Sequence, residues 1–339
     1  PVRNGKKVAV VGSGPAGLTV ANRLNRKGFE VTVFEKDERP GGLLRYGIPN
    51  FKLGKTIVDR RISLMESEGV RFRTKTKVGK NISAREVVDA FDAVCIAIGC
   101  ETPRDLPVEG RNLKGIHFAM DLLSQQIRIL QQMNVPKKDI ILAKDKRVLV
   151  VGGGDTGSDC VGTSNRHGAA SVTQIEILPK PPAGFNPQTP WPMYPQILKT
   201  SSSHEEGCIR RWSLTTNRFI GEKGVLKGVE VEEVEWIPAK DSGRPAMRPT
   251  GKKEILEADL AFLSMGFVNP VQDGLLKELA LPATERKTIA TDADGRTSIP
   301  HIFACGDAAS GASLVVRAMA SGVRTAGAIV KYLLGETEY

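Results

Sequence analysis

Glycines at a characteristic spacing follow an apolar segment close to the beginning of the sequence. Residues 8–11 read Val-Ala-Val-Val, and Gly12, Gly14 and Gly17 follow in the order G-x-G-x-x-G. In dinucleotide-binding α/β units, the first glycine permits a tight turn, the second lets the backbone approach a pyrophosphate, and the third lets a helix pack closely on its strand. The N-terminus of that helix would supply N–H donors to the phosphates. This stretch therefore predicts a dinucleotide site.

An acidic residue stands where ribose recognition is expected. Residues 31–35, Val-Thr-Val-Phe-Glu, are typical of a second strand, and Glu35 follows Gly12 by 23 residues. A carboxylate near this spacing accepts hydrogen bonds from ribose hydroxyls. Gly41 and Gly42 come soon afterwards and allow another close approach of the backbone to the bound dinucleotide.

Arg45, Lys52 and Val78 are further candidates in the same region. Arg45 or Lys52 could place a cation near the phosphates or the edge of a flavin, and either could equally be a solvated surface charge. Val78 follows a predicted strand at 70–74, where a backbone group could meet an adenine edge.

The glycine pattern returns about 140 residues later, which makes an accidental match much less probable. Residues 147–151 form a second apolar segment, followed by Gly152, Gly154 and Gly157 at the same spacing. By position Glu176 could be a second ribose acid, which would favour a cofactor without a 2′-phosphate. Four cations could instead pair with a 2′-phosphate: Arg166, Lys180, Arg210 and Arg211. The choice between NAD and NADP stays open at this point.

The elements that must position these segments follow from the spacing of apolar residues. A buried strand at 91–99 ends in glycine, and a similar apolar run within 260–267 leads to Gly266, so each unit closes in the same way and the pattern indicates an internal duplication. A short strand then ends at Gly306-Asp307 before a last helix that begins near 312–316. Four other ranges have helical or strand periodicity: helices at 54–69 and 116–133, a strand at 171–177, and antiparallel strands over 225–236.

Composition excludes several classes of protein. The chain has 339 residues, a net charge of +10 and only 5% aromatic residues, and its basic residues are dispersed rather than interleaved with stacking residues. We therefore expect no nucleic-acid binding. No apolar stretch is long enough to span a bilayer, and no signal peptide opens the chain, so we expect a cytoplasmic protein without membrane contact.

The five cysteines form no recognisable motif. They are odd in number and contain no C-x-x-C pair, so we predict no metal site, no disulfide framework and no redox-active dithiol. His204 is the other residue that could do chemistry. It stands in Ser203-His204-Glu205-Glu206, and this S-x-x-E pattern favours a helix capping box over a catalytic histidine. The preceding stretch, 179–200, is rich in proline and aromatic residues and reads as a lid or a partner-facing loop.

Taken together, these segments resemble the flavoprotein reductases with two dinucleotide-binding domains, and more closely the small (beta) subunit family of glutamate synthase. The resemblance covers essentially the whole chain and is carried by residues 10–17, 41–49, 152–160, 201–207 and 306–307. It implies an α/β fold with two Rossmann-like domains of the glutathione-reductase type, the second inserted in the first. The expected boundaries are 1–103 and 269–339 for the FAD-binding domain and 104–268 for the NAD(P)-binding domain.

The resemblance also implies cofactors and contacts. FAD would bind the first unit and NADPH or NADH the second, with hydride passing to the flavin and electrons leaving for glutamate synthesis. No catalytic acid, base or nucleophile is needed for that first step. The implied FAD contacts are Gly12, Ser13, Gly14, Pro15, Ala16, Glu35, Gly42, Leu43, Lys52, Val78, Gly306, Asp307, Leu314 and Val315. The implied nucleotide contacts are Gly153, Gly154, Asp155, Thr156 and Gly266.

Two departures from the family pattern are visible. Family members carry an N-terminal cysteine-rich domain with [4Fe–4S] clusters, which we expect only outside this sequence, since the chain begins at Pro1. Ile177 and Leu178 replace an arginine–lysine pair that reads the 2′-phosphate in the more distant dihydropyrimidine dehydrogenase. The implied partner is the large subunit of glutamate synthase, and a homo-oligomer is left open. The alternatives are an electron-relay or docking subunit, or a ferredoxin-NAD(P) reductase-like flavoprotein with another acceptor.

Overall fold

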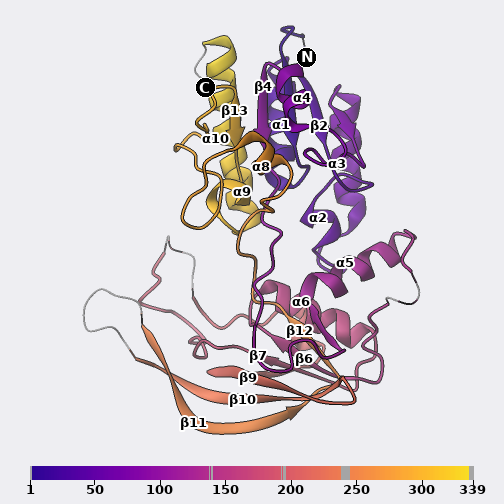
Figure 1. The fold of residues 1–339 in the computed structure, drawn as a ribbon, viewed down its shortest axis with the longest axis vertical. Coiled ribbons are helices and arrows are strands. Elements are labelled where there is room, and N and C mark those ends of the chain that lie inside the picture. The colour runs from indigo at the N-terminus through magenta and orange to yellow at the C-terminus, as the bar shows by residue number, and fades with distance from the viewer. Residues whose placement is uncertain are drawn as a thin grey trace. The chain divides into compact units, whose positions relative to one another are not determined.

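The computed structural model divides the chain into two compact units (Figure 1). Unit 1 comprises Pro1–Arg104 and Gly266–Tyr339, and unit 2 comprises Asp105–Met265. The residues that the structure describes are 2–136, 138, 140–191, 193, 196–237 and 245–335. Unit 1 is therefore built from both ends of the chain, with unit 2 inserted between them.

Unit 1 is a five-stranded parallel sheet with helices packed on it. Its strand order is β13-β4-β1-β2-β3. The strands are β1 (Lys7–Val11), β2 (Glu30–Phe34), β3 (Arg71–Arg73), β4 (Ala93–Ile96) and β13 (Ile302–Ala304). The helices are α1 (Pro15–Arg26), α2 (Leu43–Tyr46), α3 (Lys55–Ser67), α4 (Ala84–Ala90), α8 (Leu275–Leu279), α9 (Asp307–Ser310) and α10 (Val315–Leu334).

The last helix of the chain packs on the first. A Cβ atom at Gly322 of α10 would lie 2.7 Å from the carbonyl oxygen of Ala16 in α1, so the two helices approach more closely there than a larger residue would allow. Buried residues of α1, β1, β2 and α10 share one apolar core, which includes Leu24, Val33 and Ile329. Burial of this surface joins the two halves of unit 1.

Unit 2 repeats the same architecture. Its parallel sheet has the order β5-β12-β6-β7-β8. The strands are β5 (Ile116–Phe118), β6 (Arg147–Val151), β7 (Ser171–Ile175), β8 (Ile209–Arg211) and β12 (Leu260–Leu263), and the helices are α5 (Ala119–Leu130), α6 (Asp155–Arg166) and α7 (Ser202–Glu205). An antiparallel sheet of β9 (Leu214–Glu222), β10 (Val225–Ile237) and β11 (Ala246–Glu257) shares a core with the parallel one.

The two parallel sheets have the same strand order, with one difference in sequence position. The strand at one edge comes from the end of the chain in unit 1 and from the beginning of the unit in unit 2. The strand next to β4 is β13, which is the last strand of the chain, whereas the strand next to β12 is β5, which opens unit 2. The predicted α/β fold with one dinucleotide-binding unit inserted in another is confirmed. The predicted helix at 116–133 is wrong at its beginning, because Ile116–Phe118 pair in parallel with Ala261–Leu263 as β5.

The described residues contain neither a membrane-spanning helix nor a cluster of metal ligands. No helix in the described part of the chain is long and apolar enough to cross a membrane. Over the same residues, no group of three or more histidine, cysteine, aspartate or glutamate side chains could hold a metal ion.

Candidate functional site: two dinucleotide-binding turns

The turn after β1 depends on its glycines. Gly12 has φ +102°, and a Cβ there would lie 2.4 Å from the carbonyl oxygen of Ala97. A Cβ at Gly17 would lie 2.0 Å from the carbonyl oxygen of Gly12. No atom of the described residues lies within 4 Å of a Cβ built on Gly14, and none of their side chains caps α1. The start of α1 therefore has space beside Gly14 and no side-chain cap among the described residues, which fits a diphosphate.

Glu35 is buried at the end of β2 and turned toward this turn. Its side chain is 4% exposed. One carboxylate oxygen accepts hydrogen bonds from the backbone N–H of Ser13 at 3.2 Å and from the Ser13 hydroxyl, and the other accepts from the N–H of Asp37 at 2.8 Å. The Ser13 hydroxyl in turn accepts from the N–H of Gly41 at 2.8 Å. The carboxylate is thus held at the place where a ribose would be recognised.

Segments far apart in the sequence meet at this turn. A Cβ at Gly42, which has φ +51°, would lie 2.8 Å from the Cα of Gly14. A Cβ at Gly306 would lie 2.7 Å from the Cβ of Ala16. The predicted segments 12–16, 41–42 and 306–307 therefore lie against one another.

The end of the chain adds a carboxylate and a helix terminus. Asp307 is half-buried and accepts a hydrogen bond from the Ser313 hydroxyl at 3.0 Å. Burial raises the pKa of Asp307 above its usual range. Helix α10 begins at Val315 with Leu314 before it, and no side chain of the described residues caps it.

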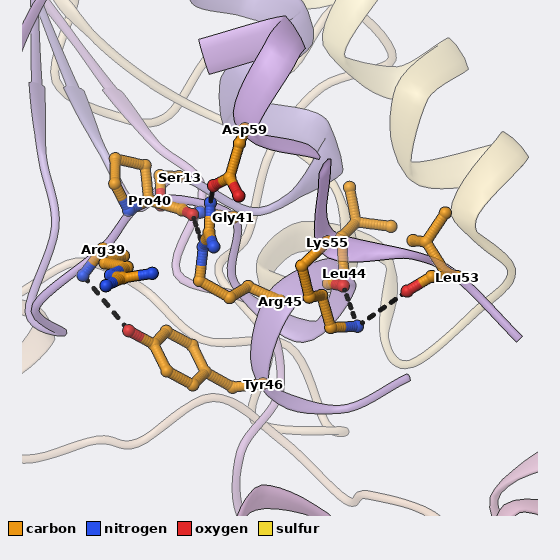
Figure 2. A network of polar contacts seen from close by, with 10 residues as sticks. All are labelled: Ser13, Arg39, Pro40, Gly41, Leu44, Arg45, Tyr46, Leu53, Lys55 and Asp59. Carbon is orange, nitrogen blue, oxygen red and sulfur yellow. Dashed lines mark hydrogen bonds and ion pairs between the residues drawn. The ribbon is translucent and has the colours of Figure 1, made fainter. Parts of the chain in front are cut away.

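Arg45 has neither of the two roles considered from the sequence. It is 1% exposed, so it is not a surface charge, and its guanidinium is engaged within the protein rather than offered to phosphates. Nε donates to the carbonyl of Pro40 at 2.5 Å, and one terminal nitrogen pairs with Asp59 at 2.5 Å. Figure 2 shows this side chain reaching from α2 between Pro40 and Asp59.

Lys55 and Tyr46 fasten the same segment, and sequence reasoning missed both. Lys55 is 7% exposed, and its ammonium donates to the carbonyls of Leu44 at 3.0 Å, Ile48 at 2.5 Å and Leu53 at 3.2 Å. The Tyr46 hydroxyl accepts from the N–H of Arg39 at 3.1 Å (Figure 2). A buried ammonium surrounded by carbonyl oxygens is well solvated by the protein, so Lys55 ties three carbonyls of segment 40–53 together.

Three of the predicted FAD contacts differ from one another in their exposure to solvent. Lys52 is exposed, with its ammonium 6.0 Å from the centroid of the Phe51 ring. Leu43 is 41% exposed at the start of α2. Val78 is buried and forms a bridge with Ile82.

The second turn repeats the geometry of the first. Gly152 has φ +120°, and a Cβ at Gly157 would lie 2.3 Å from its carbonyl oxygen. Glu176 accepts from the N–H of Gly153 at 2.7 Å and from the N–H of Leu178 at 3.0 Å. Gly154 has no described atom near a built Cβ and precedes α6, whose first residues are Asp155 and Thr156. Gly266 lies outside unit 2, and its carbonyl accepts from the N–H of Arg104.

The second turn also carries polar side chains that sequence reasoning missed. Gln174 of β7 donates from its amide nitrogen to the carbonyl of Gly152 at 2.9 Å, and the Ser264 hydroxyl lies 3.4 Å from the same oxygen. Gln174 also contacts His204 of α7, with 2.9 Å between Gln174 Oε1 and His204 Nε2. The sequence did contain a signal for Gln174, because it is a polar residue at an otherwise apolar, buried position of a predicted strand.

The predicted capping box is present, but at other residues. Helix α7 is capped by Ser201, with His204 as the reciprocal residue three positions on, instead of Ser203 with Glu206. Glu206 instead pairs with Arg166 at 2.7 Å. The imidazole fills the role that the carboxylate was expected to have, because its Nδ1 can accept from the backbone N–H of Ser201.

The four cations considered for a 2′-phosphate are engaged in different ways. Arg166 pairs with Glu206, and Arg211 pairs with Glu254. Lys180 and Arg210 lie over the Trp212 ring, 5.1 and 5.0 Å from its centroid.

This geometry can be compared with known proteins. Residues 6–322 match the family model described as pyridine nucleotide-disulphide oxidoreductase. The chain is 45% identical over 336 residues to the small chain of NADPH glutamate synthase of Mycobacterium tuberculosis, covering 98% of this chain and 68% of that one. The chain belongs to the glutamate synthase small-chain family of pyridine nucleotide-disulphide oxidoreductases.

A further relative and two solved structures are also similar to this chain. The chain is 44% identical over 352 residues to the NADH glutamate synthase of Saccharomyces cerevisiae, covering 99% of this chain and 16% of that longer protein. Mycobacterium tuberculosis FprA in complex with NADPH has the same fold, with a TM-score of 0.74 at 19% identity over 97% of this chain and 84% of that one. Thioredoxin reductase of T. acidophilum gives a TM-score of 0.65 at 20% identity over 96% of this chain and 98% of that one.

Proposed function

We propose that unit 1 binds FAD, that unit 2 binds NADPH or NADH, and that the chain supplies reducing equivalents for glutamate synthesis. Its membership of the small-chain family supports this function. The single structural observation that carries the assignment is the duplicated turn, in which Glu35 and Glu176 each accept a hydrogen bond from the backbone of a glycine-rich loop.

The residues of unit 1 fit FAD. The uncapped start of α1 beside Gly14 would bind the diphosphate. Glu35 would accept a hydrogen bond from a hydroxyl of the adenosine ribose. Asp307 would accept from a ribityl hydroxyl, and the N–H groups of Leu314 and Val315 at the start of α10 would face the carbonyl oxygens of the flavin ring. We extend the same proposal to the other predicted contacts, including Gly42, Leu43, Lys52 and Val78.

The residues of unit 2 fit a nicotinamide dinucleotide. The uncapped start of α6 at Gly154, Asp155 and Thr156 would receive its pyrophosphate, and Glu176 would accept from its ribose. Gly266 begins the stretch of chain that follows unit 2, and we keep it as a proposed nucleotide contact.

We propose that the protein's own contribution is to bind and orient the two cofactors. When bound, FAD accepts a hydride from a reduced nicotinamide and releases electrons to an acceptor. Arg45, Lys55 and Tyr46 hold segment 40–53 against the first turn, and we propose that this keeps the flavin-binding surface rigid.

Anaerobic titration of the FAD-reconstituted chain with NADH and with NADPH tests this function. We expect at least one nucleotide to bleach the flavin absorbance. A sample that retains no FAD, or whose flavin neither nucleotide reduces, would overturn the proposal.

A docking role is a second candidate, favoured by the stretch at 179–200. Trp191 is 92% exposed and Phe185 is 79% exposed, which is unusual for large apolar side chains. Pro192, Tyr194 and Pro195 of this stretch lie outside the described residues. We propose that the exposed side chains of Phe185 and Trp191 contact the large subunit of glutamate synthase. The double variant Trp191→Ser, Phe185→Ser should weaken co-purification with that subunit while flavin reduction by NAD(P)H persists, and unchanged association would contradict the docking role.

A further inference from the structure

A chain of polar side chains connects α7 to the second glycine-rich turn. The Ser158 and Ser201 hydroxyls are 2.5 Å apart, and the Ser201 hydroxyl is 3.1 Å from His204 Nδ1. His204 Nε2 is 2.9 Å from Gln174 Oε1, and Gln174 Nε2 donates to the carbonyl of Gly152 at 2.9 Å. All of these residues belong to unit 2.

The direction of each hydrogen bond follows from its ends. The backbone N–H of Ser201 lies 3.2 Å from His204 Nδ1 and can only donate, so Nδ1 is the acceptor. The carbonyl of Gly152 can only accept, so the Gln174 amide nitrogen faces it and Oε1 faces the histidine. His204 is therefore a neutral imidazole with its proton on Nε2, donating to Gln174.

At the Gln174 end of this series of hydrogen-bonded side chains, one peptide plane is held in place. The carbonyl of Gly152 and the N–H of Gly153 belong to the same peptide group. Gln174 donates to its oxygen, and Glu176 accepts from its N–H at 2.7 Å. Rotation of this plane would break both hydrogen bonds, so Gln174 controls the orientation of the same group that positions the Glu176 carboxylate.

The first unit forms the same turn without such a chain. Gln174 pairs with Val150 in β6, and the residue that pairs with Val10 at the matching position in β1 is Val33. Ala97 stands where Ser264 stands, since each donates its backbone N–H at 2.8 Å to the last residue of the central strand. Buried polar groups are costly unless paired, and the turn itself does not require them. Their presence in unit 2 alone points to a purpose specific to that unit.

We propose that His204 is a positioning residue for nicotinamide dinucleotide binding: through Gln174 it sets the Gly152–Gly153 peptide plane, and with it the Glu176 carboxylate that receives the ribose. This inference rests on the proposed binding of NAD(P)H by unit 2. His204 touches neither the nucleotide nor the flavin in this role. It acts by fastening α7 to the turn.

Two substitutions of His204 separate its contact with Ser201 from its contact with Gln174. In His204→Asn, the side-chain oxygen can replace Nδ1 as acceptor of the Ser201 N–H, but the shorter side chain does not reach Gln174. In His204→Gln, the amide nitrogen can replace Nε2 as donor to Gln174. We expect His204→Asn to raise the Kd for the better-bound of NAD⁺ and NADP⁺ about tenfold, and His204→Gln to keep it within about twofold of the wild type.

The binding measurement is calorimetric titration of the full oxidised, FAD-loaded chain with NAD⁺ and NADP⁺, which requires no turnover. In steady state, His204→Asn should raise KM for the reduced nucleotide with kcat nearly unchanged, because orientation of the binding turn is lost and the flavin is not touched. Gln174→Met, which preserves side-chain size but forms no such bonds, should reproduce the loss and carries the test if His204→Asn does not fold.

His167 offers a matched control. Its Nδ1 lies 3.4 Å from the backbone N–H of Ala143 and its Nε2 lies 2.9 Å from Gln126 Oε1, so it has the same two kinds of partner in unit 2 but no contact with the turn. His167→Asn should leave nucleotide Kd unchanged. Wild-type Kd in both His204→Asn and Gln174→Met, or equal loss in His204→Gln and His204→Asn, would overturn the positioning role. A wild-type chain that holds FAD but binds neither nucleotide would instead overturn the proposed function of unit 2, and this inference with it.

Discussion

Gln174 and Glu176 hold the two ends of a single peptide group. The amide nitrogen of Gln174 donates to the carbonyl of Gly152, and the carboxylate of Glu176 accepts from the N–H of Gly153. The two side chains lie two residues apart, one within β7 and one just after it. This arrangement makes the second turn stiffer than a glycine sequence alone would be, because glycine by itself permits many backbone conformations.

Removing the charge of Glu176 should change the choice between nucleotides. A carboxylate beside the ribose accepts hydrogen bonds from the ribose hydroxyls and repels a 2′-phosphate. In Glu176→Gln we expect the ratio of kcat/KM for NADH to that for NADPH to fall by about fivefold to tenfold, which corresponds to about 1–1.4 kcal/mol. Glu205→Gln, an exposed change in α7, is the control. An unchanged ratio would mean that Glu176 does not face the ribose.

Asp307 should lower the stability of the FAD-free chain and strengthen the binding of FAD. Burial raises its pKa, so its charged form destabilises the folded FAD-free chain at pH values above the ordinary aspartate range near 4. Asp307→Asn should therefore raise the melting temperature of the FAD-free chain at pH 7, with the gain lost near pH 3, where both states are protonated. The same variant should bind FAD more weakly. Calorimetric melting and FAD titration measure the two effects, and a lower melting temperature at pH 7 would contradict the prediction.

Arg45 should be important for both folding and FAD retention. Arg45→Met leaves the carbonyl of Pro40 without its side-chain donor and frees segment 40–53, at an expected cost of about 1–3 kcal/mol. Urea unfolding and the FAD content after gel filtration measure the result. Arg61→Met, on the exposed face of α3, should change neither quantity. A stable Arg45→Met variant with full FAD content would show that the segment does not depend on this side chain.

Asp259 should make unit 2 sensitive to acid. The Arg147 guanidinium beside it lowers the pKa of Asp259 to about 2. Since the carboxylate has its ordinary pKa near 3.9 in the unfolded chain, its contribution is present above about pH 4 and is lost as the pH falls toward 2.

Solvent screens the Asp259–Arg147 pair, so we expect Asp259→Asn to cost only about 1 kcal/mol at pH 7. The difference from the wild type should shrink to a small fraction of its pH 7 value near pH 2 in chemical unfolding followed by circular dichroism. Asp273→Asn, whose partner Lys277 is 3.9 Å away on the surface, serves as the control. A difference at pH 2 as large as that at pH 7 would exclude the ion pair as its cause.

The sequence was sufficient for features that depend on a few neighbouring residues. Gly12 and Gly152 have positive φ and have no space for a Cβ, so the sharp turn after each strand is written into the G-x-G-x-x-G spacing. Helix α3 (Lys55–Ser67) lies within the predicted range 54–69 because its apolar residues recur at helical spacing. The order of the two units also follows from the repeat of these local signals.

Contacts that depend on how the chain packs could not be predicted in the same way. The side chain of Arg45 looked like a surface or phosphate-binding cation until its partners Pro40 and Asp59 were placed around it. Ile116–Phe118 looked helical but became a strand, because β12 offered it a free edge for parallel pairing. In the same way, the Ser203–Glu206 pattern was a reasonable cap, yet Ser201 and His204 form it.

What the sequence by itself determined was thus the local chemistry: two phosphate-binding turns, each followed by an acid. What only the tertiary structure decided was which side chains face each other across the units' interiors, such as Gly42 against Gly14 and His204 against Gln174. The physical reason is that backbone torsions and helical periodicity are set over a few residues. The partner of a buried charge or amide is set by packing, which joins residues separated by tens to hundreds of positions.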